Sequence, residues 1–250
     1  MMELQVANVF KNFGGVQALK GVSLQITGNE LVGMIGPNGS GKTTLINVIG
    51  GIHKPERGEV HFNHQRIDGL RPNQIARLGI GRTFQVTRAF HRMTVMENLL
   101  VPAEAIFPER GRRALQAKAM EVLEFLNMAH LRNDYARSLS GGQRKLLELG
   151  QVLMAEPQLI MLDEPFAGVH PKLMEVIMHY ISALHEQGKG FLIISHDMTS
   201  MFQFVRRLVV LNYGEIIADD APEVVRKDAR VIEAYLGEEE EEPAQSAHSN

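Results

Sequence analysis

The stretch Gly36-Pro37-Asn38-Gly39-Ser40-Gly41-Lys42-Thr43 decides the fold of this 250-residue chain. Its spacing, G-x-x-x-x-G-K-[ST], is that of a loop whose backbone N–H groups surround phosphate oxygens. By average residue frequencies it arises by chance in roughly 1% of chains this long. A second stretch, Leu139-Ser140-Gly141-Gly142-Gln143, lies far downstream. It arises by chance in fewer than about one chain in a thousand. Together, in this order, the two motifs are too specific for coincidence.

The flanks of the first motif agree with a phosphate-binding loop. An apolar, strand-like run precedes it at 31–35, and a helical pattern follows at 44–49. Strand, loop and helix form the context that this motif requires, and they disfavour a glycine-rich turn without a ligand. In such a loop Lys42 reaches the terminal phosphates and the Thr43 hydroxyl can bind Mg²⁺. We predict that nucleotide is bound by Gly36, Asn38, Gly39, Ser40, Gly41, Lys42, Thr43 and Thr44.

The remaining pattern predicts an α/β fold. Strand-like runs at 158–162, 191–194 and 208–211 alternate with helical patterns, as in a mostly parallel sheet covered on both faces. Earlier β-patterns predict an N-terminal antiparallel β region, and from 94 to 154 only helical patterns remain. We therefore expect a P-loop NTPase (RecA-like) fold. Its predicted parts are a nucleotide-binding core (1–93 and 155–237), an inserted α-helical subdomain (94–154) and a disordered acidic tail (238–250).

Composition limits the classes of function. The chain is 44% hydrophobic and 22% charged, as in ordinary globular proteins. No apolar run approaches the roughly 20 residues that cross a bilayer, and no secretory signal is expected. The chain has no cysteine, which excludes disulfides. Its net charge of −3 gives no electrostatic case for nucleic acid.

Polar side chains follow two of the predicted strands. Asp163-Glu164 ends the run at 158–162, and ligands of open α/β sheets bind outside such strand ends. Asp163 can hold Mg²⁺ there and Glu164 can polarise an attacking water, although a helix cap is the alternative. His196 follows the run at 191–194 and can reach the terminal phosphate, although a lone histidine is usually structural or exposed. The other histidines lie in no comparable context.

Gln85 follows Gly81-Arg82-Thr83-Phe84, where the strand pattern gives way to helices. Its side-chain carbonyl could bind Mg²⁺ and respond to nucleotide. An ordinary loop glutamine is the alternative, and spacing alone favours it.

The loop at 139–143 precedes a helical pattern. A serine with two glycines at a helix N-terminus is a second anion-binding device. Because one phosphate loop suffices for one phosphate group, we expect this second loop to bind nucleotide held by another subunit. The contributing residues would be Ser140, Gly141, Gly142 and Gln143.

These motifs resemble the ATP-binding subunits of ABC transporters over about residues 4–237. Residues 36–43 look like Walker A, 159–164 like Walker B, and 139–143 match the ABC signature. The resemblance places Gln85 at the Q-loop, which reverses the interpretation from spacing, and His196 at the H-loop. It also implies that Phe13 stacks on adenine, with a core phenylalanine as the alternative.

Three further segments are similar to branched-chain amino acid importer ATPases of the LivG type. They are Arg82-Thr83-Phe84-Gln85, residues 93–100 and Ala234-Tyr235-Leu236-Gly237. Lipopolysaccharide-export and urea-importer ATPases share parts of this pattern. The chain departs from the family at His170, where Asp or Asn is usual in the D-loop, and at Ser195, where the LivG type tends to have Glu.

The resemblance implies an ATPase that drives import of branched-chain or related hydrophobic amino acids. Lys42, Glu164 and His196 would be catalytic, and Thr43, Gln85 and Asp163 would bind Mg²⁺ beside ATP. Expected partners are transmembrane permease subunits and a second ATPase subunit that pairs in the presence of ATP and is either a copy of this chain or a paralogue. A periplasmic or extracellular solute-binding protein would be an indirect partner, and the chain is expected in the cytoplasm, at the inner face of the cell membrane. A soluble ABC-type ATPase remains an alternative. A P-loop kinase has no use for residues 139–143, and the intact Asp163-Glu164 disfavours a non-catalytic subunit.

Overall fold

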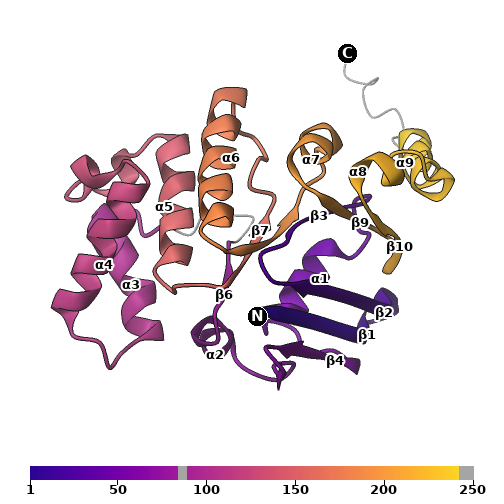
Figure 1. Ribbon diagram of the computed structural model, residues 1–250, viewed down its shortest axis with the longest axis horizontal. Helices are drawn as coiled ribbons and strands as arrows, with labels where there is room; N and C mark the ends of the chain where they lie inside the picture. Colours follow the sequence, from indigo (N-terminus) through magenta and orange to yellow (C-terminus); the bar gives the residue numbers. More distant parts are fainter. Residues whose placement is uncertain (84–88, 242–250) are drawn as a thin grey trace, which may run out of the picture.

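A computed structural model describes residues 1–83 and 89–241 of the chain (Figure 1), with side chains as far as Tyr235. The segments 84–88 and 242–250 lie outside this description. Among the described residues, two sheets carry the fold, a four-stranded sheet in the order β2-β1-β4-β5 and a six-stranded sheet in the order β10-β9-β3-β8-β7-β6.

The six-stranded sheet is parallel except for its edge strand β10, which confirms the predicted α/β class. All five residues of β3, β7 and β8 are buried, because layers cover both faces of these central strands. The strands are β3 (Leu31–Ile35), β6 (Ile80–Arg82), β7 (Leu159–Asp163), β8 (Gly190–Ile194), β9 (Arg207–Asn212) and β10 (Glu215–Asp220).

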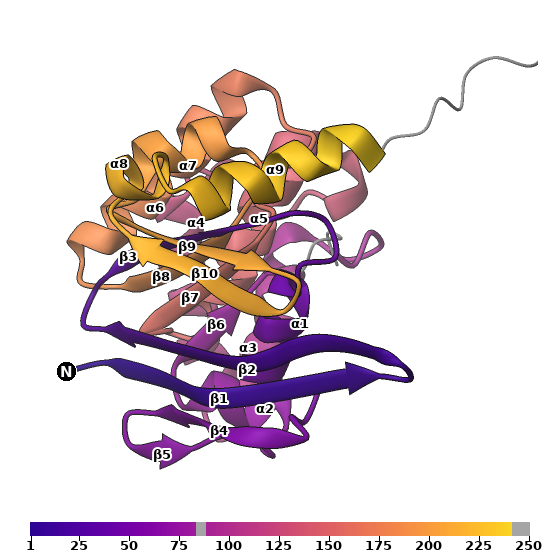
Figure 2. The same ribbon diagram turned by 90° about the vertical axis from the view of Figure 1, so that its right-hand side faces the viewer.

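The four-stranded sheet is antiparallel, as predicted for the N-terminus, and it lies below the other sheet in Figure 2. Its strands are β1 (Glu3–Phe13), β2 (Val16–Thr27), β4 (Arg57–Phe62) and β5 (Gln65–Arg66). Burial alternates along much of β1 because one face of this sheet packs on the core.

Helices lie on both faces of the six-stranded sheet (Figures 1 and 2). Before β7 the chain forms α1 (Lys42–Ile49), α2 (Pro72–Arg77), α3 (Val95–Ile106), α4 (Arg112–Phe125), the short 3₁₀ turns η1 (Ala129–Leu131) and η2 (Ala136–Ser138), and α5 (Gly141–Leu153). After β7 it forms α6 (Pro171–Glu186), α7 (Met198–Phe204), α8 (Pro222–Val225) and α9 (Ala229–Glu241). No helix in the described part of the chain is both long enough and apolar enough to cross a membrane.

Side chains of the central strands point alternately into two apolar clusters. In β7, Ile160 and Leu162 join a cluster with α3–α6, whereas Leu159 and Met161 join a cluster with α1 and the antiparallel sheet. The helices of 94–154 thus share an apolar core with the main sheet. Their assignment to a separate subdomain stays a prediction.

Helix α9 runs to Glu241. The predicted acidic tail begins at 238, so its first residues are helical rather than disordered in this structure. The remainder of the predicted tail, 242–250, lies outside the described residues.

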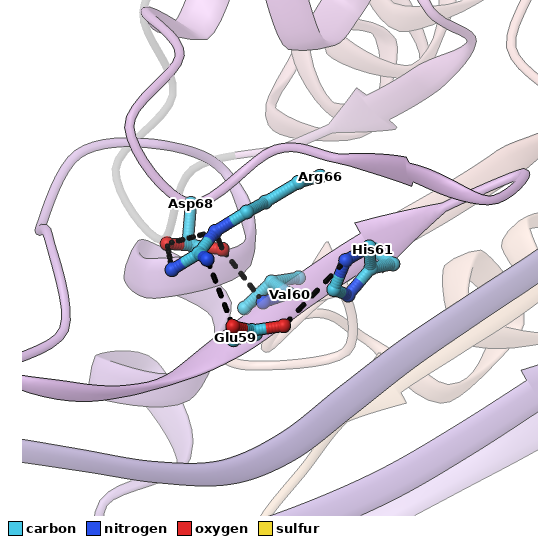
Figure 3. Close-up of polar contacts among 5 residues, drawn as sticks. All are labelled: Glu59, Val60, His61, Arg66 and Asp68. Atoms are coloured by element: carbon cyan, nitrogen blue, oxygen red, sulfur yellow. Dashed lines mark hydrogen bonds and ion pairs between the residues drawn. The ribbon is translucent and has the colours of Figure 1, made fainter.

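A buried carboxylate fastens β4 to the chain after β5 (Figure 3). Asp68 accepts hydrogen bonds from the backbone N–H of Val60 (2.9 Å) and from Nε of Arg66 (3.0 Å). Arg66 also contacts Glu59, whose second oxygen lies 3.7 Å from His61. The side chain of Asp68 is 3% exposed, so the cluster holds a charge inside the antiparallel layer.

Candidate functional site

The phosphate loop, residues 36–43, connects the carboxyl end of β3 to α1. Gly36 has φ 151°, and a Cβ there would lie 1.9 Å from the carbonyl oxygen of Leu211. Gly41 has φ 109°, and a Cβ there would lie 2.5 Å from the carbonyl oxygen of Ala18. Glycine is therefore required at both positions, because the loop is packed directly against other backbone.

Lys42 is the first residue of α1 and is 8% exposed. Its ammonium donates to the carbonyl oxygens of Gly36 (2.6 Å) and Pro37 (2.8 Å), inside the curve of the loop. Thr43 and Thr44 follow in the first turn of α1, where helix N–H groups have no partner within the helix. A cation and a helix N-terminus thus meet where anionic phosphate is expected.

Parallel register brings three sequence motifs to one edge of the sheet. Met34 of β3 pairs with Ile194 of β8, and Ile194 pairs with Asp163 of β7. The phosphate loop, the acidic pair and the segment with His196 therefore begin side by side at the carboxyl ends of neighbouring strands.

Glu164 and His196 are in direct contact. Nδ1 of His196 lies 2.7 Å from Oε2 of Glu164, although the two residues are 32 positions apart. The Glu164 side chain is 10% exposed and that of His196 is 64% exposed. The contact joins the carboxylate to Nδ1 of the ring, and the other ring nitrogen, Nε2, takes no part in it. Glu164 has φ 54°, a left-handed conformation that is rare for a non-glycine residue and is associated with functional sites.

Asp163 is the last residue of β7 and is 2% exposed. Burial raises the pKa of its carboxyl group, while the guanidinium of Arg82 opposes this shift. Oδ2 accepts from Nη2 of Arg82 at 3.2 Å, whereas Oδ1 accepts no hydrogen bond from the part of the chain that is described. Mg²⁺ binds oxygen ligands, so Oδ1 of Asp163 and the hydroxyl of Thr43 have the chemistry that a Mg²⁺ site requires.

The signature loop forms a capped helix start. Ser140 is the N-cap of α5, its Oγ accepts from the N–H of Gln143 (3.2 Å), and Oε1 of Gln143 accepts from the N–H of Ser140 (2.8 Å). Ser140 and Gly141 are exposed. In Figure 1, α5 and α1 lie on opposite sides of β6 and β7, so the loop is on another part of the molecule than the phosphate loop.

Phe13 ends β1 and is 43% exposed, which is too exposed for a core side chain. Its ring contacts the ring of His53 edge-on at a centroid distance of 5.1 Å, and Lys11 Nζ lies 5.3 Å from its centroid. Adenine stacking by Phe13 stays a prediction. Gln85 lies outside the described residues, so its role at the metal also stays a prediction.

The two residues that depart from the family pattern accept hydrogen bonds from backbone N–H groups two residues further on. His170 is the N-cap of α6, and its Nδ1 accepts from the N–H of Lys172 at 3.3 Å. Ser195 is buried, and its Oγ accepts from the N–H of Asp197, which itself caps α7. Both side chains therefore stabilise turns that leave the nucleotide edge of the sheet.

Arg82 is a member of this site that motif reasoning missed. Its guanidinium contacts Asp163 and also donates to Oδ1 of Asn47 on α1 at 2.7 Å. A sequence feature that could have pointed to Arg82 is its charge, because it ends a short strand whose other two residues are isoleucine and glycine.

A groove of about 660 Å³ lies beside the site. It is bounded by α2, α3, α5 and β6, and Phe90 on its wall is 48% exposed. Its apolar lining includes Ile75, Ile80, Phe90, Val101, Pro102 and Val152.

A glycine loop, a strand-end acidic pair and a helix N-terminus at one sheet edge define a P-loop nucleotide hydrolase. Residues 19–167 match the family model described as ABC transporter, and residues 215–241 match the one described as branched-chain amino acid ATP-binding cassette transporter. The chain belongs to the ABC transporter family, as an ATP-binding subunit with ATPase activity.

Two curated relatives share almost the full length of the chain. The probable branched-chain amino acid transport ATP-binding protein LivG of Methanocaldococcus jannaschii is 39% identical over 250 residues, covering 94% of this chain and 97% of the relative. The high-affinity branched-chain amino acid transport ATP-binding protein BraF of Pseudomonas aeruginosa is 38% identical, covering 94% and 98%.

Solved structures agree with the fold. An ATP-binding cassette of an ABC transporter in its ADP conformation superposes with a TM-score of 0.86 at 38% identity, covering 95% of this chain and 99% of that chain. Another cassette, solved as a dimer in a post-hydrolysis state with ADP and phosphate, gives a TM-score of 0.77 at 28% identity, covering 88% and 98%. These neighbours confirm the predicted ABC ATPase fold.

Proposed function

We propose that this chain hydrolyses ATP to drive an importer of branched-chain or related hydrophobic amino acids. The observation that carries this substrate class is the match over 215–241, which spans β10, α8 and α9, outside the general cassette. The names of LivG and BraF support the same class.

Each residue of the site has a role in hydrolysis. Lys42 and the loop N–H groups bind the β- and γ-phosphates, and Phe13 stacks on adenine. Glu164 orients the attacking water and accepts its proton while the water oxygen bonds to the γ-phosphorus and the bond to the ADP oxygen breaks. His196, held through Nδ1 by Glu164, presents Nε2 toward the γ-phosphate. Mg²⁺, held by Thr43, Asp163 and Gln85, would neutralise phosphate charge.

The signature loop completes the site of a second ATPase subunit. Ser140 is exposed at the start of α5, a helix that lies apart from α1 and its phosphate loop in Figure 1. Head-to-tail pairing of two subunits would place Ser140, Gly141, Gly142 and Gln143 against nucleotide bound by the partner. The dimeric state of the cassette solved with ADP and phosphate supports pairing of two subunits.

The apolar groove between α2, α3 and α5 would receive a segment of a permease subunit. Its lining is mostly apolar, and its wall includes Thr83, close in sequence to Gln85. A permease bound there would hold the chain at the inner face of the membrane and transmit nucleotide-dependent motion.

Two variants test the hydrolytic roles. Lys42→Ala is expected to abolish nucleotide binding or turnover, whereas Glu164→Gln should bind ATP and lose hydrolysis. Binding of a fluorescent nucleotide and release of phosphate measure the two steps. Lys118→Ala and Glu156→Gln are matched surface controls, since each changes a residue of an exposed ion pair. Turnover at the wild-type rate in Glu164→Gln would show that another group is the base.

Transport tests the substrate class. In cells that lack this chain, the wild-type protein should restore uptake of labelled leucine and Lys42→Ala should not. Restored urea uptake with unchanged leucine uptake would overturn the proposed solute class and leave the ATPase assignment intact.

A further inference from the structure

Arg82 joins the two halves of the nucleotide site. One terminal nitrogen donates to Oδ1 of Asn47 (2.7 Å) on α1, the helix that begins at Lys42. The other donates to Oδ2 of Asp163 (3.2 Å) at the end of β7. The Arg82 side chain is 10% exposed, so this bridge is shielded from water.

Asp163 is held by this bridge and by Thr83, the residue that follows Arg82 after β6. The hydroxyl oxygen of Thr83 accepts from the N–H of Asp163 at 3.2 Å. The N–H of Thr83 in turn donates to the carbonyl oxygen of Met161 at 3.0 Å. Arg82 and Thr83 thus hold one carboxylate oxygen and the backbone of Asp163, while Oδ1 accepts no hydrogen bond within the described residues.

The guanidinium could act on a metal at Asp163 in two opposite ways. As a nearby cation it would repel Mg²⁺ and weaken its binding. As a fixed donor it would hold the carboxylate in one orientation and leave one oxygen available for the metal. Hydrogen-bond partners of metal ligands typically change metal affinity 10–100-fold when they are removed. Arg82 is held by Asn47 on one side and by Asp163 on the other, so its guanidinium is fixed in place. This favours orientation of the Asp163 carboxylate as the dominant effect.

We propose that Arg82 is a positioning residue that orients Asp163 for the Mg²⁺ of bound nucleotide and couples this carboxylate to α1. The inference rests on the proposed function, because it assumes that ATP with Mg²⁺ is the ligand. In the sequence, Arg82 lies three residues before Gln85 of the predicted Q-loop. In the structure it connects α1, which follows the phosphate loop, to the acidic pair at the end of β7.

The test measures metal dependence without turnover. Binding of a non-hydrolysable ATP analogue is titrated once in EDTA and once in Mg²⁺. The ratio of the Kd in EDTA to the Kd in Mg²⁺ is the factor by which the metal strengthens binding. Arg82→Met is expected to lower that ratio about tenfold or more. Its Kd in EDTA should stay within about twofold of the wild-type value, because phosphate contacts come from the loop and Lys42.

Two further variants separate orientation from charge and folding. Asn47→Ala keeps the charge of Arg82 but removes its anchor on α1, and it should lower the ratio in the same direction. Arg207→Met is the matched control. Arg207 bridges Glu30 (2.8 Å) and Asp219 (2.7 Å) at the start of β9, the opposite edge of the parallel sheet, and its loss should leave the ratio unchanged.

A higher ratio in Arg82→Met would show that repulsion dominates, and an unchanged ratio in Asn47→Ala would show that the anchor on α1 does not act on Asp163. Either result overturns the inference. If the wild-type protein binds the analogue in neither condition, the proposed function itself fails.

Discussion

Asp68 and Asp163 are both buried carboxylates, but their surroundings give their pKa values opposite shifts. Burial of Asp68 would raise its pKa, but hydrogen bonds from Arg66 and from the N–H of Val60 outweigh it and lower the pKa. For Asp163, burial dominates over Arg82 and the pKa is raised. Asp68 has donors on both oxygens, whereas Oδ1 of Asp163 has none among the described residues. Asp68 is therefore suited to stability and Asp163 to binding a cation.

Replacing Asp68 tests its stabilising role. Asp68→Ala leaves the buried N–H of Val60 without its acceptor, so the free energy of unfolding should fall by about 1–3 kcal/mol near neutral pH. A lowered pKa means that the contribution of Asp68 is complete above its unfolded pKa of about 3.9 and is lost as the pH falls through the folded value.

Urea unfolding of both proteins at several pH values measures this difference. The gap between wild type and variant should stay constant down to about pH 5 and shrink below about pH 4. Glu59→Ala is the control, because it removes an exposed partner of Arg66 and should change stability by less than about 0.5 kcal/mol. A gap that does not shrink in acid would contradict the assignment.

At the scale of elements, α3 and α5 begin with the same capping arrangement. The N-cap of α3 is Thr94, whose Oγ1 accepts from the N–H of Glu97 at 3.2 Å. The N-cap of α5 is Ser140, whose Oγ accepts from the N–H of Gln143 at the same distance. Each cap is closed by the side chain three residues later, so the two helices form a matched pair.

This pair separates a capping role from a nucleotide role. Thr94→Ala and Ser140→Ala should each cost about 1 kcal/mol of stability. Ser140→Ala alone should also lower ATP turnover, by about tenfold or more, because it would remove the proposed hydrogen bond to a phosphate of the partner's nucleotide. Thermal melts and phosphate release measure the two effects. Equal turnover in both variants would mean that Ser140 is only a cap.

At the scale of the molecule, the phosphate loop and the signature loop lie on separate parts of one subunit (Figure 1). Two subunits are needed to bring such loops together around one nucleotide. Hydrolysis would separate them again, since the bound γ-phosphate is lost. The assembly is therefore expected to depend on ATP.

Light scattering after gel filtration tests this dependence. Glu164→Gln should double its molar mass when ATP and Mg²⁺ are present, because the nucleotide joins two subunits and is not consumed. The double variant with Lys42→Ala should stay monomeric. A Glu164→Gln protein that is monomeric at every ATP concentration would contradict pairing of two copies of this chain.

Most elements that surround the site could be predicted from local patterns. Runs at 31–35, 158–162 and 191–194 are continuous apolar strands, and they became β3, β7 and β8. Several short or exposed elements were not predicted. Strands β4, β5 and β10 and helix α8 carry mixed polar patterns, and their pairing depends on neighbours distant in sequence.

The sequence by itself determined the nucleotide loop, the strand-end acids and the signature helix, because glycine conformation, apolar periodicity and capping are local properties. Only the tertiary structure decided the contact of Glu164 with His196, the bridge of Arg82 to Asn47 and Asp163, and the packing of Gly36 against Leu211. These contacts follow from the register of parallel strands. Because these strands are buried on both faces, they are almost continuously apolar, and no alternation of polar and apolar residues in the sequence marks their register.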